Sequence, residues 1–170
     1  AAPAVYLLRG GAAGRTDAGA VAALRWVEDI PADADAPHAM PPVHALPLRP
    51  GGLRVLVSDL LFTGDPAPLL RALTHGRGSG IVFCPFADEE ARPDWRGPCD
   101  FEEVEGGERE WLHMDGATMR RYLAAYQTHC TLWKEQAVRF RVPLARVAAA
   151  GPLDSALTAG ALAAGALETC

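Results

Sequence analysis

Two polar residues directly follow the most apolar short stretch of the chain. Residues 53–62 read Leu-Arg-Val-Leu-Val-Ser-Asp-Leu-Leu-Phe. The apolar run predicts a buried parallel strand, with Ser58 and Asp59 where the strand ends. Ligands of open α/β sheets bind at the carboxyl ends of the strands, so these two side chains are candidate ligand contacts. The alternative is that Asp59 only hydrogen-bonds backbone amides of the loop that follows.

A second group of residues has the types that bind metals. His38 and His44 lie near Asp33 and Asp35. They stand in a proline-stiffened segment without the regular spacing of a metal site, so we expect them to be solvated.

Two further groups have types that could do acid–base or nucleophilic chemistry. Acidic residues gather on one predicted hairpin: Glu102, Glu103, Glu105, Glu108 and Glu110. Exposed hairpin glutamates usually only solvate the edge of a sheet, so we do not expect catalysis there. His129 and Cys130 are neighbours on a predicted helix and point about 100° apart, so they do not form a base and nucleophile pair.

Composition narrows the class of protein. The chain has 170 residues, of which 49% are hydrophobic and 22% charged, as in one globular domain. Its net charge of -5 offers no basic surface for nucleic acid or an anionic membrane. We find no stretch apolar enough to span a membrane and expect a cytoplasmic protein. The four cysteines form no Cys-x-x-Cys pair, so free thiols are expected, with a disulfide left open: Cys84, Cys99, Cys130 and Cys170.

The first part of the chain must position the stretch at 53–62. Residues 5–9 predict a short strand, and the glycine-rich residues 10–14 predict a loop. Thr16 or Asp17 is a candidate cap for a helix with Val21, Leu24 and Val27 on one face. Residues 31–50 hold six prolines and predict an extended connection over the surface of the domain.

The second part predicts alternating helices and strands. Asp65 and Pro66 open a helix that His75 and Gly76 close, and residues 80–86 predict the next buried strand, which completes a βαβ unit. Residues 101–105 and 109–114 predict a β-hairpin around the glycine pair at 106–107. A long helix capped by Asp115, a strand at 144–148 and a short helix after Gly151-Pro152 follow. The long helix carries one apolar stripe: Met119, Tyr122, Leu123, Tyr126, Cys130, Trp133, Ala137 and Phe140.

From about residue 50 onward the chain resembles a known family. The similar segments are residues 53–62, Gly64-Asp65-Pro66, Leu69-Leu70, residues 81–86, Asp94-Trp95-Arg96-Gly97, the Gly-Gly-Glu-Arg turn, Arg121-Tyr122-Leu123 and Val142-Pro143. They resemble the C-terminal half of the bacterial domain-of-unknown-function family fifty-eight. Members of that family resemble von Willebrand factor A domains, and their genes often accompany MoxR-type AAA ATPases.

The resemblance implies a fold and a candidate metal site. The fold is a single α/β, Rossmann-type domain over residues 1–170, with a mostly parallel sheet, flanking helices and a C-terminal β-hairpin insertion. Metal-binding von Willebrand A domains hold a divalent cation through an Asp-x-Ser-x-Ser turn, a threonine and an aspartate. Asp59 stands where that last aspartate belongs, and Ser58 is beside it, so Mg²⁺ is a possible cofactor. The chain contains no Asp-x-Ser-x-Ser.

That difference leads us to expect a domain that is incomplete at its N-terminus and lacks the first strand. In a doubly wound order, the first strand lies between the strands at 5–9 and 53–57. Without it, we expect these two strands to pair directly, or a second copy of the chain to cover the open sheet edge in a homodimer.

We therefore carry two hypotheses for function. The first is a non-enzymatic protein-interaction or adaptor domain, with a MoxR-type AAA ATPase as the partner that the resemblance implies. Its predicted contacts are the apolar loop residues Leu60, Leu61 and Phe62 together with Thr63. The alternative for the three apolar side chains is that they cover the adjacent helix. The alternative is a metal-dependent hydrolase or phosphatase-like enzyme that uses Asp59.

Overall fold

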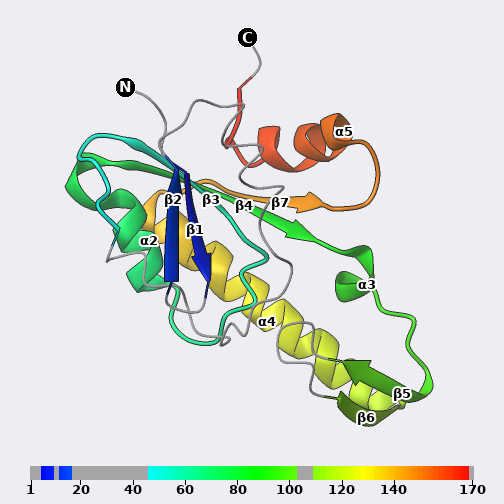
Figure 1. Cartoon of the computed structure of the whole chain (residues 1–170). Helices are drawn as coiled ribbons and strands as arrows, with labels where there is room; N and C mark the ends of the chain where they lie inside the picture. The colour runs from blue at the N-terminus through cyan, green and yellow to red at the C-terminus, as the bar shows by residue number, and fades with distance from the viewer. Residues whose placement is uncertain (1–4, 10–11, 17–45, 103–108, 169–170) are drawn as a thin grey trace.

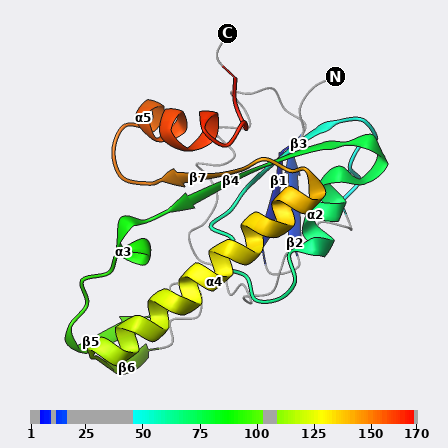
Figure 2. The same ribbon diagram turned by 180° about the vertical axis from the view of Figure 1, so that it is seen from behind.

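The computed structural model describes residues 5–9, 12–16, 46–102 and 109–168. Its centre is a sheet of three parallel strands in the order β3-β4-β7, formed by Leu53–Val57, Ser79–Phe86 and Leu144–Ala148. Helices flank this sheet on both sides (Figures 1 and 2). The predicted α/β class with a mostly parallel sheet is confirmed at this level.

One face of the sheet carries the larger core. Helix α2 (Ala67–Thr74) and helix α4 (Gly116–Phe140) cover this face. The buried side chains of this core cluster are Leu60, Leu69, Leu70, Leu73, Val82, Cys84, Trp133 and Val142. Figure 2 shows α2 and α4 together on this side of the strands.

The opposite face has a smaller cover. The short helix α5 (Leu153–Leu157) continues into a π-helical turn, η3 (Thr158–Leu162). A cluster of small residues packs this segment on β7: Ala145, Val147, Ala161 and Ala166. Gly160 makes the close approach possible, because a Cβ atom there would lie 2.1 Å from the carbonyl oxygen of Arg146.

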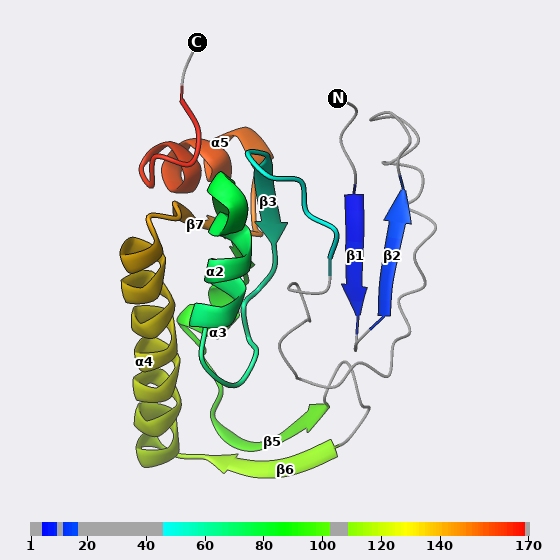
Figure 3. The ribbon, with the colours of Figure 1, turned by 90° about the vertical axis from the view of Figure 1, so that its left-hand side faces the viewer.

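The N-terminal strands form a sheet of their own. Strand β1 (Val5–Arg9) pairs antiparallel with β2 (Ala12–Thr16), and Figure 3 shows this pair apart from the central sheet. The predicted loop at 10–14 is therefore wrong over the residues of β2, and Thr16 ends a strand instead of capping a helix. The predicted direct pairing of 5–9 with 53–57 is also wrong. Strand β1 pairs instead with the segment that directly follows it, because a short loop loses the least conformational entropy on closing. The predicted helix after Asp17 and most of the connection at 31–50 lie outside the described residues.

Helix α4 has the predicted cap. The Asp115 carboxylate accepts hydrogen bonds from the amides of Ala117 at 2.9 Å and Thr118 at 2.7 Å. These bonds hold the pKa of Asp115 below its ordinary value. At the other end, Arg141 takes a left-handed conformation with φ 55°, and the next strand begins three residues later.

Strands β5 (Gly97–Glu102) and β6 (Arg109–Met114) form an antiparallel hairpin, as predicted. The second strand has the predicted bounds, whereas the first begins four residues before the predicted range 101–105, of which the structure describes only Phe101 and Glu102. It lies against the N-terminal end of α4, away from the central sheet (Figure 1). The connection from β4 contains a short helix, α3 (Asp88–Ala91), where the sequence indicates only a polar, turn-rich segment. The turn around the glycine pair at 106–107 lies outside the described residues.

Arg54 joins β3 to the end of α2. Its side chain is 8% exposed, and its guanidinium donates to the carbonyl oxygens of Ala72 at 2.7 Å, Leu73 at 3.1 Å and Arg49 at 2.9 Å. The last carbonyls of a helix have no partner inside the helix, so a cation placed there satisfies them and interacts favourably with the helix dipole. Gly78 leaves room for the guanidinium, because a Cβ atom at that position would lie 2.6 Å from its central carbon.

Candidate functional site

The loop after β3 uses its polar side chains to fix its own backbone. Ser58 Oγ accepts a hydrogen bond from the amide of Leu60 at 3.1 Å, and Asp59 Oδ1 accepts one from the amide of Leu61 at 3.2 Å. These are the local turns that serine and aspartate favour. They hold Leu60 at φ 62°, a strained conformation for a leucine. The structure thus has the loop hydrogen bond that was the alternative role for Asp59.

The strained turn sends the predicted contact residues in different directions. Leu60 is 2% exposed and belongs to the core, and Phe62 is half-buried and packs against the same core. Leu61 is 48% exposed, and Thr63 is also exposed. Of the four residues predicted to contact a partner, Leu61 and Thr63 are exposed, Phe62 is half-buried and Leu60 is buried.

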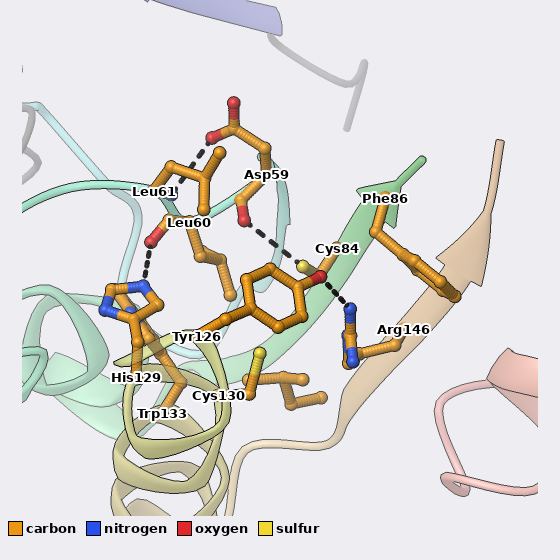
Figure 4. A pocket seen from close by; sticks show the side chains of 11 residues that line it. Asp59, Leu60, Leu61, Cys84, Phe86, Tyr126, His129, Cys130, Trp133 and Arg146 are labelled. Carbon is orange, nitrogen blue, oxygen red and sulfur yellow. Dashed lines mark hydrogen bonds between the residues drawn. The ribbon is translucent and has the colours of Figure 1, made fainter. Parts of the chain in front are cut away.

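Behind this loop, residues from α4, β4 and β7 surround a small cavity (Figure 4). The Cys84 thiol donates to the carbonyl oxygen of Asp59 at 3.4 Å. His129 Nε2 lies 2.7 Å from the carbonyl oxygen of Leu60, so the proton of a neutral ring is on Nε2. The cavity volume of about 20 Å³ is room for about one water molecule. A substrate does not fit in this space.

Arg146 is the arginine that lines this cavity, and sequence reasoning missed it. The guanidinium donates a hydrogen bond to the Tyr126 hydroxyl and lies 4.2 Å from the centre of the Phe86 ring. The sequence does contain a signal for this role: Arg146 stands in the middle of an otherwise apolar strand. A charged residue in that position needs partners on neighbouring elements. Within the described residues, Arg146 Nε and Trp133 Nε1 are buried without a hydrogen-bond partner.

The acid–base properties of the cavity do not favour nucleophilic chemistry. Burial raises the pKa of the Cys84 thiol to about 11, although Arg146 opposes the shift. Burial also raises the pKa of Tyr126. At neutral pH both groups are therefore protonated, whereas a thiolate is the form that attacks substrates. The cavity links α4 to the strand ends, and burial keeps Cys84 and Tyr126 in it protonated.

The candidate metal ligands give an incomplete set. Asp59 is exposed, its Oδ1 already accepts an amide, and Ser58 Oγ lies 3.5 Å from it. Within the described part of the chain, no group of three or more His, Cys, Asp or Glu side chains is arranged to hold a metal ion. Mg²⁺ demands six oxygen ligands and usually keeps several waters. Ser58 and Asp59 alone do not fit such a site.

The other residues considered for chemistry have ordinary settings or lie outside the described residues. Glu102 pairs with Arg109 at 2.6 Å on the surface of the hairpin, and Glu110 is exposed. Cys84, Cys99 and Cys130 are free thiols. Residues outside the described part are Asp33, Asp35, His38, His44, Glu103, Glu105, Glu108 and Cys170.

The sequence did not indicate the exposed side of β3. Side chains of a strand alternate between its two faces, and the register places Val55 beside Ile81 and Val57 beside Phe83. Helices α5 and η3 pack on this face of the sheet, but they contact only β7 and part of β4 and leave β3 uncovered. Leu53, Val55 and Val57 are 66%, 53% and 66% exposed. We call these three residues the β3 strip; the predicted burial of this strand is wrong on that face.

The backbone of β3 is also open on one edge within the described residues. Gly52 O accepts from the amide of Ser79, and the amide of Ser58 donates to Phe83 O, so even-numbered residues bond to β4. In a parallel ladder the alternate residues direct their N–H and C=O groups to the other side. The backbone groups of the β3 strip therefore point away from β4.

Comparison with known proteins finds no family model, no curated protein and no solved structure that matches this chain. In the described part of the chain, no helix combines the length and apolar character that crossing a membrane requires.

Proposed function

We propose that this chain is a non-enzymatic protein-interaction domain that binds a partner through the β3 strip. The observation that carries the proposal is the exposure of three alternating apolar residues on a strand of a parallel sheet. Parallel sheets are normally covered on both faces, and a contiguous apolar surface on a domain marks an interaction site. Leu61, 48% exposed on the loop that follows β3, extends the apolar character toward the carboxyl end of the strand.

The chemistry of the surface suits an extended segment of a partner. The outward N–H and C=O groups of the strip would continue the ladder with an added strand, and the apolar side chains would give the contact its hydrophobic area. Affinity in this mode comes from main-chain hydrogen bonds, and specificity comes from alternate side chains. The resemblance to von Willebrand A-like proteins of the family described above supports a MoxR-type AAA ATPase as the partner.

A second copy of the chain is the alternative occupant of the same edge. The strip has an apolar residue at both ends and at its centre, so two antiparallel copies would place apolar side chains opposite each other about a two-fold axis. This arrangement is the homodimer through an open sheet edge that the sequence analysis predicts. An enzyme that uses Asp59 has less support, because its carboxylate holds the loop and Lys134, the only lysine, is exposed on α4.

The test uses one charge substitution and a matched control. Val55→Glu puts a carboxylate in the middle of the strip, whereas Val138→Glu puts one on α4, where Val138 is 72% exposed. Binding of a purified MoxR-type ATPase is measured by biolayer interferometry, and self-association by sedimentation velocity. We expect Val55→Glu to weaken one of the two associations at least tenfold, as burial of an unpaired charge requires, and Val138→Glu to leave both unchanged.

The two measurements also separate the two occupants. Loss of ATPase binding alone identifies the ATPase, and loss of self-association alone identifies the homodimer. The proposal fails if both associations are the same in wild type, Val55→Glu and Val138→Glu.

A further inference from the structure

A second and larger pocket lies far from the carboxyl edge of the sheet. It opens between the β5–β6 hairpin and the N-terminal half of α4, at the end of the molecule where Figures 1 and 2 show the hairpin. Its volume of about 390 Å³ falls in the range of small-molecule sites. The residues that define it are Trp95, Phe101, Leu112, Met114, Tyr122 and Arg121.

Aromatic packing holds the walls of this pocket. The Trp95 ring makes T-shaped contacts with Phe101 and Tyr122, each at 5.1 Å between ring centres. The Tyr122 hydroxyl donates to the carbonyl oxygen of Glu90 at 3.0 Å, which fixes the ring from the other side. Met114, at the end of β6, is 6% exposed. A two-stranded hairpin is marginally stable alone, so these contacts with α4 hold it in place.

The charge of the lining points to one kind of ligand. Within the described residues, Arg121 is the only charged side chain that lines the pocket. Asp100 and Glu102, whose carboxylates lie 3.8 and 2.6 Å from the Arg109 guanidinium, alternate with Phe101 and so point to the other face of β5. Glu110, the cross-strand partner of Phe101, is on the same face of the hairpin as the pocket but is not among the residues that line it. Among the described residues, the pocket therefore combines aromatic and aliphatic walls with one guanidinium, that of Arg121.

We infer that this pocket binds a small organic anion with a flat apolar body, such as an aromatic carboxylate. The body would lie against Trp95, Phe101 and Leu112, and the anionic group would take hydrogen bonds from Arg121. A guanidinium matches the planar geometry of a carboxylate with two parallel N–H donors. This site is separate from the β3 strip, so the inference does not depend on the proposed interaction with a partner.

The experiment compares a charged and a neutral probe of the same shape. Binding of 2-naphthoate and 2-naphthamide to the full chain is measured by isothermal titration calorimetry. We expect naphthoate to bind about tenfold more tightly, as one charge-assisted contact at a partly exposed site provides. In Arg121→Gln this preference should disappear. Arg120→Gln is the matched control, because Arg120 is the preceding exposed arginine of α4 and points about 100° away.

A spectroscopic readout locates the probe. In a ¹H–¹⁵N spectrum, the indole signal of Trp95 should shift on addition of naphthoate, whereas that of Trp111, which is 72% exposed on the other face of β6, should stay in place. The inference is overturned if naphthoate and naphthamide bind equally, or if Arg120→Gln and Arg121→Gln have the same effect. Binding of a peptide with a C-terminal phenylalanine, without binding of naphthoate, would also overturn it and assign the pocket to a protein partner.

Discussion

Replacement of Arg54 by methionine tests the link between β3 and the end of α2. Methionine keeps much of the aliphatic length but removes the guanidinium, and the three carbonyl oxygens of Ala72, Leu73 and Arg49 lose their donor. Each hydrogen bond that involves a charged group contributes about 1.5–3 kcal/mol. The cost of burying the cation, which the variant no longer bears, offsets part of this sum.

The net loss in the free energy of unfolding should be about 3 kcal/mol, because three carbonyl oxygens lose their donor at about 1–3 kcal/mol each and the avoided cost of burying the cation offsets part of this loss. For a domain of this size each kcal/mol lowers the melting temperature by about 2–4 °C, so a fall of about 6–12 °C is expected. Arg54→Lys should lie between wild type and Arg54→Met, because one ammonium cannot reach three carbonyls on two segments.

Urea unfolding followed by circular dichroism measures these differences. Arg71→Met is the matched control, because Arg71 is an exposed arginine on the same helix and its replacement should change the free energy of unfolding by less than about 0.5 kcal/mol. The reasoning is refuted if Arg54→Met and Arg71→Met unfold at the same urea concentration with the same slope.

Three further predictions concern stability and thiol reactivity. Gly160→Ala should destabilise the domain by about 1–3 kcal/mol in urea unfolding, because its methyl group would meet a backbone oxygen of β7, whereas Gly116→Ala, with only a flexible side chain nearby, should not. Cys84 should resist iodoacetamide at pH 8 in the folded protein, since its pKa of about 11 keeps the thiol protonated. Its alkylation, followed by mass spectrometry, should rise only in alkaline solution or urea. An alkylation rate of Cys84 equal to that of Cys99 would contradict this. Asp115→Ala should lower the melting temperature at neutral pH. The folded-state pKa of Asp115 is depressed, so the stability from this cap is present above the pKa of the unfolded state and lost as the pH falls through the folded value; a difference from wild type that stayed constant through that range would contradict the assignment.

The sequence was sufficient where structure depends on neighbouring residues. The cap at Asp115, the helical periodicity after it and the strand at residues 109–114 are local signals, and the structure confirms all three. The strand at 144–148 was also identified correctly from its apolar residues between Pro143 and the turn at Gly151.

Features that depend on pairing or packing with another segment could not be obtained in the same way. The sequence Ala-Ala-Gly-Arg-Thr of β2 has low strand propensity, and only its pairing with β1 makes it a strand. An unbroken apolar run such as that of β3 predicts burial on both faces, whereas the extent of α5 and η3 decides which face is covered. The roles of Arg54 and Arg146 follow from contacts 18 to 20 residues away in sequence.

The site was predicted only in part for the same reason. The position of Ser58 and Asp59 at the end of a parallel strand was correct, and so was the alternative that Asp59 accepts a hydrogen bond from an amide of its own loop. The direction of the four residues after it depends on the positive φ of Leu60, which no sequence pattern for leucine indicates. The pocket beneath the hairpin requires Trp95 and Tyr122 to meet, and they are 27 residues apart.

Helix α4 is packed into the core of the domain at one end only, and this affects how the domain unfolds. Its 25 residues extend about 37 Å, and its two buried side chains, Trp133 and Ala137, both belong to its second half. The first half extends beyond the central sheet, and the β5–β6 hairpin packs against its N-terminal end. Amide hydrogen exchange should therefore divide the molecule into two units. The hairpin and the first turns of α4 can open and close together while the sheet stays folded, so that one end of the domain can melt and re-form without loss of the other.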